Sequence, residues 1–194
     1  MFFPIHNSRM QKWFKEVMGE QCNHRVSLPD GYGEIYVPQV SFNVIYILSH
    51  LYRHIFTEGI GLRQLLDYYY VLISDDLLLI RDRVQKELKP LGLWKFAQAV
   101  MFVMKEVFGL SEDRMIAPMD EKEGRFLLDE IMRGGNFGQY DDRMGSKVGE
   151  SKIHRYFRMN LRNLRFVKHY PAEALSEPLF RTWFAVWKKI HGIE

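Results

Sequence analysis

The segment from Ser41 to Glu58, SFNVIYILSHLYRHIFTE, constrains the fold more than any other part of the chain. Its apolar residues cover most of the circumference of a helix, and such a helix is stable only when other elements surround it. We therefore expect this segment to be the central helix of a domain. The chain has 194 residues, which is enough to bury a sizeable core in one domain.

Further helices are predicted by apolar residues at intervals of three and four, with glycine or proline between the segments. The first is expected at about 8–19. From residue 41 onward, the expected helices cover about 41–57, 62–73, 75–89, 91–108, 121–133, 150–168 and 176–190. The predicted fold is therefore mainly α, a multi-helix bundle with a short N-terminal extended segment or hairpin.

The extended segment, Tyr32 to Val37, lies between a Pro-Asp-Gly turn and Pro38, a pattern typical of a hairpin or edge strand. Because an isolated strand cannot satisfy its backbone groups, either residues 22–28 pair with it or its partner lies outside this chain. We divide the chain into residues 1–37, which hold the first helix and this strand, and a helical domain at 38–194.

Composition excludes several classes of protein. The chain has a single cysteine, Cys22, which rules out an internal disulfide and a cysteine-based metal motif and indicates the cytoplasm. No segment reaches the about 18 apolar residues of a membrane span, and the first residues do not have the pattern of a signal peptide. We therefore expect no membrane among the partners.

Polar side chains lie along one stripe of the apolar central helix. Asn43, His50 and His54 fall on this stripe, and the next expected helix carries Arg63 and Asp67 one turn apart. The intervening Gly-Ile-Gly turn is short enough to make the two helices antiparallel.

Three interpretations of these residues are open. The first is a hydrogen-bond cluster that fixes the register of two core helices. The second is a substrate-binding face, on which Arg63 presents a planar fork suited to phosphate or carboxylate. The third is a metal site on the two histidines, but HLYRH lacks the glutamate of the zinc-metalloprotease motif and no third ligand is assured. We therefore assign no metal ligand.

A basic helix is expected near the C-terminus, although the net charge of the chain is only +3. Residues 151–169 include six Lys or Arg and no acid, and Arg155, Arg158, Arg162 and Arg165 fall on one helical face. One interpretation is an amphipathic surface helix whose apolar face packs on the core. The other is binding of a polyanion, because four arginines create a local positive field. Attachment to a membrane surface is disfavoured, because the core is expected to take the apolar face.

Familiar catalytic motifs are missing. The glycine-rich segment from Gly134 to Gly138 is not followed by a Walker-type lysine or preceded by a strand, which excludes a P-loop. The sequence also has no nucleophile elbow and no pairing of a cysteine nucleophile with histidine.

The run HLYRHIFTEGIGLRQLLDYY, from His50 to Tyr69, resembles the signature of a family of uncharacterised bacterial nucleotidyltransferases. This family is related to the DNA polymerase β superfamily and is found widely in Bacteroidetes. The later run RFLLDEIMRGGNFG and the C-terminal arginine-rich and tryptophan-rich helices occur in the same order, so the resemblance covers essentially the whole chain. It implies that certain side chains face or brace an active-site cleft and bind substrate, namely His50, His54, Arg63, Gln64, Asp67 and, in the later loop, Asn136.

One part of the family pattern is missing from this sequence. Intact members carry an upstream mixed sheet with a Gly-Asp-x-Asp-type carboxylate pair and a third acid, which hold the metals for transfer from an NTP to an acceptor. Mg²⁺ and NTP are therefore implied only for an intact member, and this chain supplies no cofactor ligands and no catalytic residues. The resemblance then implies the helical C-terminal part of such a protein, inactive by itself. Residues 1–37 would be the remnant of the junction to the missing sheet, which would explain a strand without a partner.

Expected partners follow from this interpretation. They are a nucleotide and, through the surface that the missing sheet would have covered, a second copy of the chain. Nucleic acid is not specifically indicated. The alternative function is a non-enzymatic binding or scaffold domain that docks an acidic partner or a polyanion through the basic helix.

Overall fold

The structure is a computed structural model that describes residues 7–21, 24–134 and 151–192. The helices in these ranges are α1 (Asn7–Gln21), α2 (Val40–Thr57), α3 (Leu62–Leu72), α4 (Asp75–Leu88), α5 (Trp94–Phe108), α6 (Glu121–Gly134), α7 (Lys152–Asn163) and α8 (Pro171–Ile190). Short 3-10 turns lie at Pro29–Gly31 (η1), Glu112–Arg114 (η2) and Leu164–Phe166 (η5). The predicted mainly α fold is therefore confirmed.

Most helix bounds agree with the sequence prediction, and the C-terminal pair differs. The predicted helix at 150–168 ends earlier, because α7 passes into η5 after Asn163. The last helix begins earlier than predicted, with Pro171 in its first turn, where a missing backbone N–H carries no penalty.

The strand predicted near residues 32–37 has its partner within the chain. Strands β1 (Arg25–Ser27) and β2 (Glu34–Tyr36) form an antiparallel hairpin in which Val26 faces Ile35. The turn between them places Asp30 and Gly31 at positive φ angles of 58° and 75°. The explanation that a missing sheet left this strand unpaired is therefore wrong, and the local alternative is correct.

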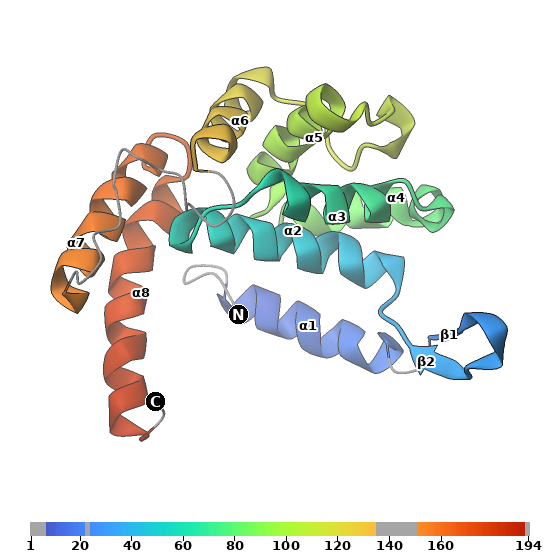
Figure 1. Cartoon of the computed structure of the whole chain (residues 1–194), viewed down its shortest axis with the longest axis horizontal. Coiled ribbons are helices and arrows are strands. Elements are labelled where there is room, and N and C mark those ends of the chain that lie inside the picture. The colour runs from blue at the N-terminus through green and yellow to red at the C-terminus, as the bar shows by residue number, and fades with distance from the viewer. Residues whose placement is uncertain (1–6, 22–23, 135–150, 193–194) are drawn as a thin grey trace.

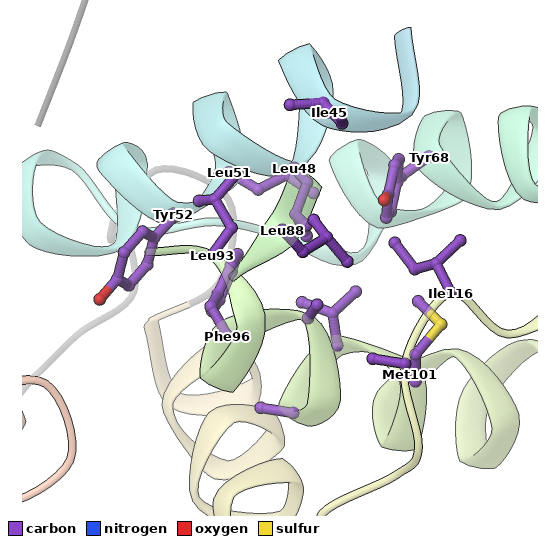
Figure 2. Close-up of a cluster of buried hydrophobic side chains, with 14 of the residues drawn as sticks. Ile45, Leu48, Leu51, Tyr52, Tyr68, Leu88, Leu93, Phe96, Met101 and Ile116 are labelled. Atoms are coloured by element: carbon purple, nitrogen blue, oxygen red, sulfur yellow. The ribbon is translucent and has the colours of Figure 1, made fainter. Parts of the chain in front are cut away.

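The expected central helix is the centre of the core. Figure 1 shows α1 along one side of α2, with α3 and α5 on the opposite side, and the end of α4 reaches α1, where Trp13 donates to Glu87. On the first side, the rings of Trp13 and Phe42 stack with centroids 5.7 Å apart. On the other side, the buried side chains of α2 meet those of α3, α4 and α5, including Leu48, Tyr68 and Phe96 (Figure 2). Burial on both sides explains why so much of the circumference of α2 is apolar.

The short turn between α2 and α3 makes these helices antiparallel, as predicted (Figure 1). Gly59 in this turn has a φ angle of 87°, a conformation that glycine adopts without steric cost. The Tyr68 hydroxyl donates to the carbonyl oxygen of Val44 over 3.0 Å and so links the two helices far from the turn.

The C-terminal helices lie at the end of the molecule where α2 finishes, and the second half of α8 extends away from the body (Figure 1). Every residue from Thr182 to Val186 is exposed. None of the helices in the described ranges combines the length and the apolar content that crossing a bilayer requires.

Candidate functional site

A row of aromatic and imidazole rings runs along one side of α2. Its members follow one another at intervals of four residues: Phe42, Tyr46, His50 and His54. Phe42 stacks on Tyr46 with centroids 5.1 Å apart, and Tyr46 stacks on His50 at 6.2 Å. The row begins under α1, where Phe42 is buried, is exposed at Tyr46, and is partly buried at the two histidines. This is the stripe that the sequence indicated.

The two histidines of the row are in direct contact. The Nε2 atoms of His50 and His54 lie 2.9 Å apart, and the two rings meet edge to face. Burial lowers the pKa of His50 below its ordinary value of 6.5, and the neighbouring His54 lowers it further. His50 is therefore mainly neutral at neutral pH. Beyond His54, the Glu58 carboxylate lies 3.4 Å from Nδ1.

The residues singled out on α3 have different environments. The Gln64 side chain accepts a hydrogen bond from the backbone N–H of Gly61 over 2.6 Å, which caps the start of α3. Arg63 and Asp67 are exposed, and neither forms a hydrogen bond or an ion pair with any residue in the part of the chain that the structure describes. The fold therefore uses Gln64 and leaves Arg63 and Asp67 available. Asn136 lies outside the described residues.

The basic helix is oriented differently from the sequence expectation. Phe157, Leu161 and Leu164, on its apolar face, are 59–60% exposed, whereas the core was expected to cover them. The residues turned inward are Asn163 and, in η5, Phe166, which are only 1% exposed. Phe157, Leu161 and Leu164 therefore do not pack into the core.

Three of the four arginines make contacts within the fold. Arg162 donates to the backbone carbonyl oxygens of Ile55 and Thr57 at the end of α2. Arg165 forms an ion pair with Glu130 of α6 at 3.1 Å. Arg158 is partly buried and also has an interaction partner. The Arg155 side chain is outside the described part of α7.

A cluster of buried acids was not predicted from the sequence. Glu123 on α6 is 6% exposed and lies 3.2 Å from Lys95 Nζ and 2.9 Å from His169 Nδ1. Glu173 and Glu177, one turn apart on α8, are also buried.

The environment of Glu173 and Glu177 suits a structural role. Burial raises the pKa of Tyr52 well above its ordinary value, and the charge and hydrogen bond of Glu173 raise it further. Glu177 forms an ion pair with Arg181 at 3.0 Å. The Glu177–Arg181 pair lies within α8, whereas Glu173 contacts Tyr52 of α2 and the charge of Glu177 also acts on Arg53 of α2, so the two acids hold α8 against the body of the protein.

A small pocket lies beside the C-terminal end of α2, with Gly134 on its rim. Its lining is mostly apolar, and its two charged members, Arg162 and Glu130, are those that contact the α2 carbonyls and Arg165. Because both charged groups already have partners in the fold, we do not assign a ligand to this pocket.

We also searched the described ranges for side chains grouped to bind a metal ion. These ranges contain no group of three or more His, Cys, Asp or Glu side chains arranged to hold a metal ion. Two-metal nucleotidyl chemistry requires such a group of carboxylates.

Comparison with known proteins identifies a family whose model matches more than half of the chain. The model of a family described as an uncharacterised nucleotidyltransferase matches residues 2–109, which include the N-terminal helix, the hairpin and α2 to α5. No curated protein and no solved structure matches the chain. His50, His54, Arg63, Gln64 and Asp67 all lie within the matched residues.

Proposed function

The chain belongs to this family of uncharacterised nucleotidyltransferases, and on that basis we propose that it is the helical, substrate-contacting part of a nucleotidyltransferase-like protein. In that protein, a nucleotidyl group passes from an NTP to an acceptor. The exposed side of the α2–α3 hairpin contacts the nucleotide or the acceptor. We also place the protein in the cytoplasm, as its single cysteine indicates.

The proposal is based mainly on the exposure of Arg63 and Asp67 and on their lack of partners in the described part of the chain. Both are charged, exposed and one turn apart, and the described part of the chain provides neither with a partner. Other arginines support the fold: Arg114, for example, donates to the carbonyl oxygens of Ile73 and Ser74 and pairs with Asp75.

The chemistry of the two side chains suits a nucleotide. The Arg63 guanidinium can bind two phosphate oxygens at once, and the Asp67 carboxylate can accept a hydrogen bond from a hydroxyl or amino group. Both groups can therefore bind a ligand without breaking a contact that stabilises the fold.

Transfer itself requires groups that the described residues do not supply. The divalent cation implied by the family needs clustered carboxylates, and the described ranges offer no such cluster. We therefore assign no residue of this chain to the cation and expect no nucleotidyl transfer from the chain by itself.

The alternative of a docking helix for a polyanion has less support. Arg162 and Arg165 donate to carbonyl and carboxylate groups of the protein itself. A polyanion would have to compete with these contacts, whereas a ligand of Arg63 would not.

The test is a two-dimensional amide NMR titration with ATP and with CTP, each with and without Mg²⁺. We expect chemical shift changes confined to the hairpin at residues 41–73. Arg63→Gln should weaken binding about tenfold or more, since hydrogen bonds to charged groups contribute about 1.5–3 kcal/mol. Arg83→Gln on α4 is the matched control, because Arg83 pairs with Glu87 outside the hairpin.

Two results would overturn the proposal. One is an absence of shifts at millimolar nucleotide. The other is a set of shifts confined to the arginine face at 155–165, which would favour the docking alternative.

A further inference from the structure

The contact between His50 and His54 points beyond substrate binding. Their Nε2 atoms face each other at 2.9 Å, one helical turn apart at the partly buried end of the row of rings. Two imidazole nitrogens bound to one tetrahedral ion with bonds of about 2.0–2.1 Å lie about 3.3 Å apart. The pair is therefore within a few tenths of an ångström of the spacing needed to chelate one ion.

Neighbouring groups hold both rings in this orientation. The Glu58 carboxylate lies 3.4 Å from the buried Nδ1 atom of His54 without the geometry of a hydrogen bond, and its negative charge favours a proton on Nδ1 and the lone pair on Nε2. A carboxylate behind a histidine in this way is the usual support of a metal-binding imidazole. The Tyr46 ring stacks on His50, with an angle of 17° between the two planes.

We propose that His50 and His54 form a two-histidine site for a transition metal ion such as Zn²⁺ or Ni²⁺, with Glu58 orienting His54. Imidazole nitrogen binds these ions well, whereas Mg²⁺ prefers oxygen. The site is thus distinct from the Mg²⁺ chemistry of nucleotidyl transfer. It does not depend on the proposed function.

Metal binding changes the tautomer of one ring and conserves protons. Without metal, and with the His54 proton on Nδ1 as the Glu58 charge favours, His50 donates from Nε2–H to the Nε2 lone pair of His54. With metal, both Nε2 atoms donate their lone pairs to the ion, and the His50 proton moves to Nδ1. The described residues contain no ligand cluster of three or more His, Cys, Asp or Glu around this pair, so the remaining coordination positions go to water or to an anionic oxygen.

The test is titration of the tag-free, EDTA-treated full chain with Zn²⁺ and with Ni²⁺, in the absence of nucleotide and followed by calorimetry. We expect one ion per chain. His50→Ala and His54→Ala should each weaken binding at least tenfold, because one ligand cannot chelate. Glu58→Gln should weaken it about tenfold, as the loss of an orienting carboxylate does elsewhere. The control is His24→Ala, which removes a histidine that directly precedes β1 and lies outside α2.

Nitrogen NMR of the histidine rings keeps the proposal testable if a histidine variant fails to fold. In the wild-type chain, Zn²⁺ should shift the Nε2 resonances of His50 and His54 more than those of other histidines. Unchanged Nε2 resonances, or equal affinity in the wild-type chain and both histidine variants, would overturn the proposal. Neither result bears on nucleotide binding, which the Arg63→Gln titration measures separately.

Discussion

Tyr68 shows how one buried hydroxyl ties stability to pH. The side chain is completely buried, and burial raises its pKa well above the ordinary value near 10. The folded state therefore holds the phenol proton more tightly than the unfolded state does. The stability that this difference provides is fully present below about pH 10 and is lost as the pH rises above it.

The corresponding prediction concerns Tyr68→Phe. This change removes the hydrogen bond to Val44, so we expect the free energy of unfolding at neutral pH to fall by about 1 kcal/mol. Above about pH 10, the stability of the variant should decline less steeply than that of the wild type. Urea unfolding between neutral pH and pH values above about 10 measures the loss of stability and its alkaline slope. Tyr70→Phe, at an exposed position, is the control. Identical alkaline slopes in wild type and Tyr68→Phe would contradict the prediction.

Gly124 of α6 packs directly against Phe102 of α5. A Cβ atom at this position would lie 2.4 Å from the Cβ, Cγ and Cδ1 atoms of Phe102, so the helices would have to separate. We expect Gly124→Ala to lower the free energy of unfolding by about 1–3 kcal/mol, the usual cost of overpacking. Calorimetric unfolding measures the effect.

Gly19→Ala is the matched control for this substitution. Gly19 lies within α1, and an added Cβ would meet nothing within 4 Å. The change should leave stability unaltered or raise it by up to about 1 kcal/mol, because alanine is the better helix former. Equal effects of the two substitutions would show that helix propensity, and not contact with Phe102, decides the result.

The sequence alone identified some residues of the candidate functional site and missed others, and both results have physical reasons. His50 and His54 stood out because polar groups are unusual on an apolar helix. Glu123 and Glu173 gave no such signal, since acids on helices are usually solvated. Their burial depends on which helix faces meet, and the sequence pattern of one helix does not contain that information.

At the scale of elements, the last residues of α7 bind the end of α2. The last carbonyl groups of a helix have no partner within it. Here Arg162 donates to those of Ile55 and Thr57, and the Asn163 side chain donates to that of Phe56 over 3.0 Å. Donors at the end of a helix also match the negative end of its dipole.

We expect Arg162→Ala to lower the free energy of unfolding by about 1.5–3 kcal/mol, the range for hydrogen bonds to charged groups. Lys168→Ala, which removes one positive charge from an exposed position, should change it by less than about 0.5 kcal/mol. Chemical denaturation measures both. A loss of polyanion binding without a loss of stability in Arg162→Ala would instead support the docking alternative.

These contacts also explain why the helices were predictable and the orientation of α7 was not. Apolar periodicity and glycine punctuation predict where a helix forms, and α2 to α6 follow that pattern closely. Amphipathicity predicts that the apolar face is buried. On α7, the carbonyl groups of α2 select Arg162 and Asn163 as the inward residues instead, and the change to 3-10 geometry turns Phe166 into the core.

At the scale of the whole molecule, the two ends of the chain contribute unequally to the core. Met10, Trp13 and Val17 of α1 are buried, and the Trp13 Nε1 atom donates to Glu87 of α4 over 2.7 Å. The outer face of α8 is a stripe of apolar side chains that are 54–75% exposed: Leu175, Leu179, Trp183, Val186 and Ile190. The sequence indicated self-association through the surface that a missing sheet would have covered, and this stripe is a different apolar surface through which the chain could associate.

A chain that ends after Thr182 tests whether the end of α8 contributes little to stability and whether its apolar stripe mediates association. It keeps Glu173 and Glu177, which interact with Tyr52 and Arg53 of α2, and loses a segment that buries little surface. We therefore expect its free energy of unfolding to stay within about 1 kcal/mol of that of the full chain.

We also expect sedimentation equilibrium to show association of the full chain that increases with concentration and is lost in the shortened chain. The double substitution Trp183→Lys with Ile190→Lys should have the same effect on association without shortening the chain. A full chain that remains monomeric at high concentration would contradict association through this stripe, and a large loss of stability would contradict the peripheral role of the segment.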